Sequence, residues 1–188
     1  MDTDTIDGAG LTSGKACLRA KTALDVAPGY RLIQQHGALL EGMGGGKPNP
    51  ASGLDEHQLA QLWTPWERPR DGGVDYQLAI ADADSGDFRG SLVVRSAGPG
   101  KLADLGYWVD PEFWGQGLGT EAVCLALAWA FRHLEASGVT ASVQPDNSRS
   151  RRLLHSLGFK DLGPIPGLAG ALIAYHLPRS GCPAPNGN

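Results

Sequence analysis

Three glycines at alternate positions, Gly115, Gly117 and Gly119, form the stretch of this sequence best suited to bind an anion. Glycine lets the backbone approach a ligand closely, and the alanine- and leucine-rich segment that begins at Thr120 is typical of a helix. The first turn of such a helix offers unpaired amide N–H groups with a partial positive charge. The stretch therefore predicts an anion site, and phosphate is the anion most often bound in this way.

The glycine spacing distinguishes between three kinds of phosphate site. A nucleotide-triphosphate loop ends in Lys-Ser or Lys-Thr, and this turn has Gly119-Thr120 instead. A dinucleotide fold has Gly-x-Gly-x-x-Gly after the first of several parallel strands, whereas here Gly-x-Gly-x-Gly follows a run of antiparallel ones. The third kind is the diphosphate cradle of coenzyme A, and a tight strand-to-helix turn without a ligand is the remaining alternative.

Three consecutive antiparallel strands are expected to lead into the glycine turn, because apolar and polar residues alternate along them and turn residues separate them. They span residues 76–81, 88–95 and 102–109. Upstream, the sequence predicts a strand at 16–20, a helix from a cap at Asp25 to about Leu40, a glycine-rich loop at 42–53, and a second helix capped by Asp55.

The helix after the turn is apolar on most sides, so it is expected to be largely buried until Gly138 ends it. A strand at 139–143 should then run parallel to the strand before the helix, because such crossovers are right-handed. Asp146 or Asn147 is expected to cap a short helix at 148–156. Two final strands are predicted at 159–162 and 171–177, around a turn at 163–167.

Length and composition limit the class of protein. The 188 residues, 41% of them hydrophobic, suit a single domain at 15–177 between a flexible arm at 1–14 and a flexible tail at 178–188. A formal charge of −4 argues against a general nucleic-acid binder. The three cysteines lack metal-ligand spacing, and no apolar run approaches the roughly 20 residues that span a bilayer. A cytoplasmic protein without a metal or a membrane partner is expected.

Four motifs, in this order, resemble the GNAT superfamily of N-acetyltransferases. They are Leu105-Gly-Tyr-Trp-Val109, Trp114-Gly-Gln-Gly-Leu-Gly-Thr-Glu-Ala122, Asn147-Ser-Arg-Ser150 and Leu157-Gly-Phe159. Within the superfamily the sequence is most similar to the branch of the ribosomal-protein-alanine N-acetyltransferases, which are RimJ/RimL-like, and of related diamine and aminoglycoside acetyltransferases. The resemblance implies an α+β GNAT fold, with a mixed, mostly antiparallel central sheet flanked by helices.

The resemblance also implies an activity, which is direct transfer of the acetyl group of acetyl-CoA to a primary amine in a ternary complex. The amine would belong to a protein N-terminus, a polyamine or an amino-bearing small molecule. Relatives of this kind often pair as homodimers. The family's common tyrosine near the end of the short helix is absent, because Leu154 stands where it would fall. A non-catalytic acyl-CoA-binding sensor or interaction module is therefore the alternative.

The family pattern assigns most of the donor site to the backbone. The amides of the glycine turn would hold the pyrophosphate, namely those of Gln116, Gly117, Leu118, Gly119 and Thr120. Backbone groups of Trp108 and Val109 would run beside the pantetheine arm. Asn147 matches an asparagine that meets the pantetheine, with a simple helix cap as its alternative role. Ser150 matches a serine that protonates the leaving thiolate, with an ordinary surface position as its alternative.

The family resemblance also suggests a base and an acceptor pocket. The attacking ammonium must first lose a proton, so a carboxylate is expected to act as a base. Asp104 is the candidate, because many relatives carry an acidic residue just before the Gly-Tyr, and a solvated aspartate is its alternative role. Candidate walls of the acceptor pocket are Trp63, Trp66, Tyr76 and Tyr107. The two tryptophans are equally consistent with aromatic anchors that pin a loop.

Overall fold

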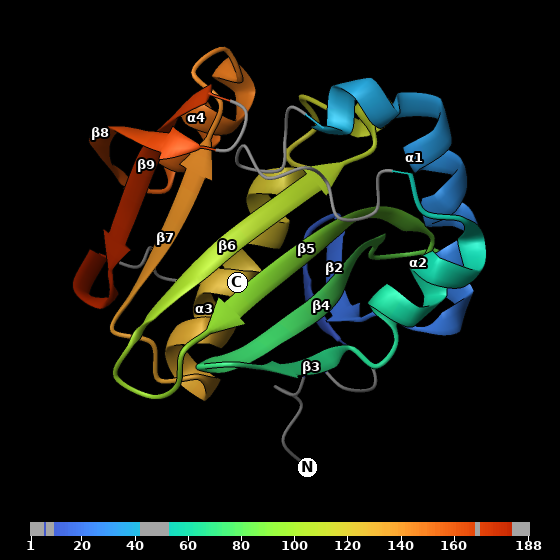
Figure 1. Ribbon diagram of the computed structural model, residues 1–188, viewed down its shortest axis with the longest axis horizontal. Coiled ribbons are helices and arrows are strands. Elements are labelled where there is room, and N and C mark those ends of the chain that lie inside the picture. The colour runs from blue at the N-terminus through green and yellow to red at the C-terminus, as the bar shows by residue number, and fades with distance from the viewer. Residues whose placement is uncertain (1–5, 7–9, 42–52, 168–169, 182–188) are drawn as a thin grey trace.

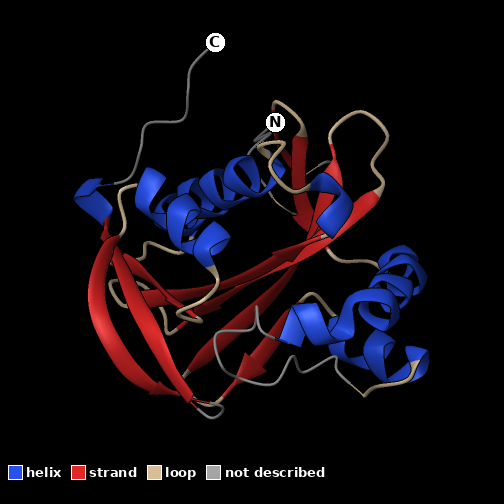
Figure 2. Ribbon diagram, turned by 90° about the horizontal axis from the view of Figure 1, so that it is seen from above, coloured by secondary structure: helices blue, strands red, loops and turns tan. Residues whose placement is uncertain are grey.

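A computed structural model describes residues 6, 10–41, 53–167 and 170–181 of the chain. One mixed sheet runs through the molecule, and helices cover both of its faces (Figures 1 and 2). The expected α+β architecture with a mostly antiparallel sheet is confirmed. No helix of the described residues is both long and apolar enough to cross a membrane.

The strands follow the order β1-β2-β4-β5-β6-β7-β9-β8, and β3 pairs with β4 outside this path. Among the strands of the described residues, only the pairing of β6 with β7 is parallel. The strands are β1 (Leu11–Ser13), β2 (Ala16–Ala20), β3 (Glu67–Arg70), β4 (Gly73–Asp82), β5 (Phe88–Ser96), β6 (Leu102–Val109), β7 (Gly138–Val143), β8 (Lys160–Gly167) and β9 (Gly170–Pro178). The predicted meander before the glycine turn and the parallel crossover after it are both confirmed.

Within the part of the chain that the structure describes, four α-helices pack on this sheet, and their apolar faces divide the core in two. They are α1 (Val26–Glu41), α2 (Glu56–Trp63), α3 (Leu118–His133) and α4 (Ser148–Ser156). Leu78 and Ile80 on β4 pack in the larger cluster with α3 and α4, whereas Ala79 packs in the smaller one with α1 and α2. This division follows from the strand geometry, because successive side chains of a strand point to opposite faces.

Strands β6 and β7 separate along their length, and this separation positions the site. Their pairing joins Leu102–Asp104 to Gly138–Thr140 and does not continue beyond these residues. Figure 1 shows the two strands side by side at one end and apart at the other, where β7 leads to α4. The second half of β6 therefore has one edge that no strand of the described ranges covers.

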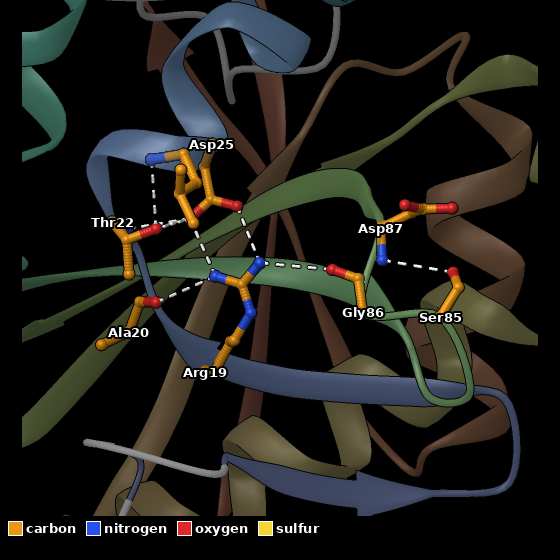
Figure 3. A network of polar contacts seen from close by, with 8 residues as sticks. Arg19, Ala20, Thr22, Asp25, Ser85, Gly86 and Asp87 are labelled. Carbon is orange, nitrogen blue, oxygen red and sulfur yellow. Dashed lines mark hydrogen bonds and ion pairs between the residues drawn. The ribbon is translucent and has the colours of Figure 1, made fainter.

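The first helix begins differently from the prediction. Thr22, and not Asp25, is the N-cap, and it opens the short 3-10 helix η1 (Ala23–Asp25) that precedes α1. Asp25 completes the capping box from its third position and accepts hydrogen bonds from both Nη atoms of Arg19, each 2.8 Å long (Figure 3). Burial alone would raise the pKa of Asp25, but hydrogen bonds from Arg19 and Thr22, together with the charge of Arg19, lower it.

Three other predictions missed strands at the edges of the sheet. The predicted arm at 1–14 contains β1, which pairs with β2, and Ile6 is buried. The Pro-containing segment after Trp63 forms β3 where a loop was an alternative, and the predicted turn at 163–167 is part of β8. Proline is tolerated in such strands because an edge strand leaves alternate N–H groups unpaired. The predicted loop at 42–53 lies almost entirely outside the described residues.

Candidate functional site

A cleft of about 890 Å³ opens where β6 and β7 separate. That volume is within the range of about 300–1,000 Å³ that is usual for small-molecule sites. Residues from the end of β6, the glycine turn and both helix starts line it: Tyr107, Val109, Phe113, Trp114, Gly115, Gly117, Gly119, Thr120, Asp146, Asn147, Ser148, Arg149, Ser150, Arg152, Leu153 and Ser156.

The glycine turn has the geometry of an anion cradle. Gly115 and Gly117 have φ values of +74° and +91°, which side chains rarely adopt. Gly117 is the N-cap of α3, and no side-chain hydrogen bond caps this helix. The first-turn amides, which include those of Gly119 and Thr120, therefore have no intrahelical acceptor, and both of these residues line the cleft. Leu118 packs in the core, so only its backbone belongs to the turn.

Contacts with the β1–β2 hairpin hold the glycine turn in place. The Glu121 carboxylate on α3 accepts hydrogen bonds from the backbone N–H of Lys15 (2.6 Å) and of Ala16 (3.1 Å). The Lys15 ammonium donates to the carbonyl of Gln116 (3.4 Å), whose side chain donates to the Glu112 carbonyl (2.8 Å). Gln116 itself does not line the cleft. Its contacts with Lys15 and Glu112 hold the turn in place outside the cleft lining.

The second half of β6 presents backbone groups to the cleft in an alternating pattern. The N–H of Asp110 donates to the Arg89 carbonyl (2.7 Å), and Val109 lies opposite Gly90 on β5. Because bonded and non-bonded pairs alternate in an antiparallel ladder, the peptide groups of Tyr107 and Val109 point away from β5, and those of Trp108 point toward it. Of the two residues predicted to flank a pantetheine arm, only Val109 is oriented toward the cleft.

The indole of Trp114 closes one end of this exposed edge. Its Nε1 donates to the carbonyl of Val109 (2.8 Å), which leaves the N–H of Val109 as the available group of that residue. The side chain of Trp108 lies on the opposite face of the sheet, where its ring contacts Phe88 at a centroid distance of 5.8 Å. Trp108 therefore has no direct part in the cleft.

Two hydroxyl groups meet across the cleft. The Tyr107 hydroxyl on β6 and the Ser150 hydroxyl on α4 lie 2.7 Å apart. Burial raises the pKa of Tyr107 to about 12, although the hydrogen bond with Ser150 acts in the opposite direction. Tyr107 therefore keeps its proton throughout the neutral range. The sequence assigned Tyr107 to the acceptor pocket, whereas the structure places it beside Ser150.

Asn147 fixes the start of the helix that carries Ser150. Its side-chain oxygen accepts a hydrogen bond from the Ser150 N–H (3.1 Å), so Asn147 is the cap of α4. Both residues line the cleft, and Ser150 is partly buried, so it is not an ordinary surface residue. Leu154, which stands where the common family tyrosine would fall, is fully buried in the core.

Asp104, the predicted catalytic base, lies outside the cleft that Tyr107 and Ser150 line. It lies on the half of β6 that still pairs with β7, and it does not line the cleft. Its carboxylate forms an ion pair with Arg95 on β5 (2.7 Å) and accepts a longer hydrogen bond from Thr140 on β7 (3.4 Å). These contacts join β6 to β5 and to β7, so the structure gives Asp104 a role in joining strands.

Three aromatic residues predicted to line an acceptor pocket pack elsewhere. Trp63 is 3% exposed and contacts Phe88, with ring centroids 5.6 Å apart. Trp66 and Tyr76 contact each other at 5.7 Å on the other side of the sheet. None of the three lines the cleft formed by the described residues. The alternative role as aromatic anchors agrees with these contacts.

The structure also brings two arginines to the cleft that the sequence interpretation passed over. Arg149 lies over the ring of Trp114, 4.0 Å from its centroid, and Arg152 lines the same wall. The sequence could have predicted that the two arginines lie together, because they are three residues apart in a helix and residues at that spacing share one helix face. Among the described residues, no group of three or more His, Cys, Asp and Glu side chains could hold a metal ion.

Comparisons with known proteins agree with this geometry. The family model described as "Acetyltransferase (GNAT) domain" matches residues 16–160. The uncharacterized protein YkkB of Bacillus subtilis is 26% identical over 110 residues, which are 57% of this chain and 64% of that protein. The uncharacterized N-acetyltransferase p20 of Bacillus licheniformis is 36% identical over 61 residues, 32% of this chain and 34% of that protein. The matches thus span about one to two thirds of these relatives.

Solved structures share the fold at low sequence identity. RimJ of Mycobacterium smegmatis, in complex with a CoA-disulfide, has a TM-score of 0.73 at 23% identity, with 94% of this chain and 86% of that chain covered. A ribosomal L7/L12 alpha-N-protein acetyltransferase, RimL, solved with coenzyme A, has a TM-score of 0.73 at 17% identity, with 90% and 98% covered. These likenesses establish the fold.

Proposed function

Since the chain belongs to the family of acetyltransferase (GNAT) domains, we propose that it transfers the acetyl group of acetyl-CoA to a primary amine by direct attack in a ternary complex. The observation that supports this most is the cleft itself. It combines an uncapped helix start, an exposed strand edge and a pair of hydroxyl groups in one cleft. These three features match the three parts of acetyl-CoA.

The diphosphate of the donor would lie at the glycine turn. The amides from Gly117 to Thr120 supply hydrogen-bond donors at a positive helix terminus, which favours an anion. Arg149 and Arg152 line the same cleft and add positive charge for the phosphate groups of the nucleotide end. The Arg149–Trp114 stack, at 4.0 Å, also provides a flat surface suited to a base.

The pantetheine arm would extend along the exposed edge of β6. Its amide groups can pair with the available peptide groups of Tyr107 and Val109, as an added strand would. This path leads from the glycine turn toward Ser150, which lies in the first turn of α4. The thioester would then lie beside the Tyr107–Ser150 pair, where a hydroxyl can donate a proton to the leaving sulfur.

The acceptor is proposed only as a class, namely a primary amine on a protein N-terminus, a polyamine or a small molecule. RimL, a ribosomal L7/L12 alpha-N-protein acetyltransferase, shares this fold, and so does a ribosomal-protein-S5-alanine acetyltransferase from Vibrio fischeri. A peptide beginning with alanine is therefore the first acceptor to test.

The proposal is tested by mixing the purified chain with acetyl-CoA and a panel of amines, and measuring thiol release. The panel contains peptides with alanine or serine N-termini, a polyamine and an aminoglycoside. Release above the rate of hydrolysis with at least one amine is expected. Tight CoA binding without release on any of them would contradict the proposal and favour a non-catalytic CoA-binding sensor.

A further inference from the structure

The hydroxyl pair in the cleft consists of two residues that reach it from opposite walls. Tyr107 comes from β6 and packs partly against the main core, while Ser150 comes from the first turn of α4. Their oxygen atoms lie 2.7 Å apart, which is a short hydrogen bond between two neutral hydroxyls. Each side chain is thus held by its own element before the bond forms.

The direction of this hydrogen bond follows from the acidity of its partners. A phenol is a stronger acid than an aliphatic alcohol, so it is the better donor, and the alcohol oxygen is the better acceptor. With its pKa raised to about 12, Tyr107 still carries its proton at neutral pH and can fill the donor role. If Tyr107 donates, the proton of Ser150 is not used within the pair and is available to the cleft.

We propose that Tyr107 is a positioning residue for the acid step: its hydroxyl donates to Ser150 Oγ and so directs the Ser150 proton toward the leaving sulfur. The inference rests on the proposed acetyl transfer. It gives Tyr107 a function that the buried Leu154 cannot perform, and it assigns that function to a residue on β6 and not on α4.

The proton transfers of this step balance. The amine nitrogen attacks the thioester carbon and a C–N bond forms; the C–S bond then breaks, and its electron pair goes to the sulfur. Ser150 gives its proton to the sulfur, and Tyr107 gives its own proton to Ser150. The proton that the acylated nitrogen loses restores the phenol. No charge remains on the pair after one turnover.

The pair can be tested with a double-mutant cycle. The variants are Tyr107→Phe, Ser150→Ala and the combination, and Tyr30→Phe on α1 is the matched control for loss of a phenol hydroxyl. Turnover, the KM for acetyl-CoA, the Kd for CoA and the melting temperature are measured for each, with the best amine of the panel. Phe at 107 keeps the ring and its packing.

Ser150→Ala is expected to lower kcat about 100-fold, which is the lower range for loss of a general acid. Tyr107→Phe should lower kcat about 10-fold and leave the KM and the CoA Kd within about two-fold, because positioning acts on the transition state. The combined variant should equal Ser150→Ala alone, since Tyr107 acts through Ser150. Tyr30→Phe should leave kcat unchanged.

Three results would overturn the inference. The first is a kcat of Tyr107→Phe that matches the wild type. The second is a combined variant whose loss equals the product of the two single losses. The third is a Tyr107→Phe variant whose CoA affinity falls by the same factor as its kcat, or whose melting temperature falls well below that of the Tyr30→Phe control. Either result indicates a structural role. A wild type that transfers to no amine overturns the proposed function as well, so the two failures are distinguishable.

Discussion

The two halves of β6 differ in what they pair with. In the first half, Asp104 is tied to Arg95 on β5 and to Thr140 on β7, and both edges of the strand are covered. In the second half, Tyr107 and Val109 keep one edge exposed, and the cleft lies against it. The same strand thus stabilises the sheet at one end and offers a binding surface at the other. The point where β7 leaves β6 separates these roles.

Of the changes considered for the two halves of β6 and their surroundings, a negative charge in the glycine turn should have the largest effect, and this effect is on CoA affinity. Gly117→Asp places a carboxylate where the diphosphate would bind and forces a side chain onto a φ of +91°. We expect CoA affinity to fall by about 100-fold or more, because two anions then compete for one cradle. Isothermal titration with CoA measures the change.

The matched control for that variant is Gly100→Asp in the turn before β6. Gly100 also has a positive φ, of +71°, and a Cβ there would meet nothing within 4 Å. The change adds the same charge and a similar backbone cost at the paired end of the strand. CoA affinity should stay within about two-fold, and equal losses in the two variants would contradict the assignment of the cradle.

Removal of one cleft arginine should have a smaller effect. Arg149→Ala takes away a cation that lies over Trp114, so we expect the CoA Kd to rise about 10-fold at low salt. The difference from wild type should shrink as salt screens the charge. Arg31→Ala, on an exposed position of α1, is the control and should leave the Kd unchanged. A Kd for Arg149→Ala that matches the control would place the phosphates elsewhere.

Alkaline pH should destabilise the open half of β6 through Tyr107. The pKa of Tyr107 is raised to about 12 in the folded chain, above the value of about 10 in the unfolded chain. The stability it contributes is therefore fully present below pH 10 and is lost as the pH rises through 12. Between pH 9 and pH 11 the wild type should lose about 1 kcal/mol more unfolding free energy than Tyr107→Phe. Identical losses in urea titrations would contradict the raised pKa.

The smallest effect is expected at the paired end of β6. Asp104→Asn removes a partly exposed ion pair with Arg95, which is worth about 0–1 kcal/mol. Turnover should stay within about two-fold of wild type, because the carboxylate does not line the cleft. A fall in kcat of ten-fold or more, at unchanged CoA affinity, would support Asp104 as the catalytic base. It would contradict the claim that the first half of β6 has only a structural role.

The sequence predicted the elements of the site better than the directions of its side chains. The bounds of β6 and α4 agree with the structure, and so does Asn147, one of the two predicted caps, because alternation, a capping residue and a closing glycine are local signals. The roles of Trp108 and Asp104 depend on register with β5 and β7, which no local pattern encodes. The Tyr107–Ser150 contact joins residues 43 positions apart, and only the crossover brings them together.

The surroundings of the aromatic residue Trp63, in another part of the molecule, are likewise not encoded by local sequence patterns. Trp63 is suited equally to a pocket wall and to a core anchor, and only its packing distinguishes the two. In the structure its ring lies under the Lys21 ammonium at 3.8 Å and against Phe88. Lys21 in turn donates to Ser91 (2.7 Å), and burial lowers its pKa well below the usual value, against the charge of Asp25. Phe88 and Ser91 come from β5 and Lys21 directly follows β2, so these partners are far from Trp63 in sequence.

A crystal structure of the chain with bound CoA tests the central claim most directly. The claim is that the exposed half of β6 and the glycine turn form the donor site. The expected complex has diphosphate oxygens within hydrogen-bond distance of the amides from Gly117 to Thr120, and a thiol close to Ser150 Oγ. Coenzyme A bound outside this cleft, or a cleft that stays empty at saturating coenzyme A, would contradict it.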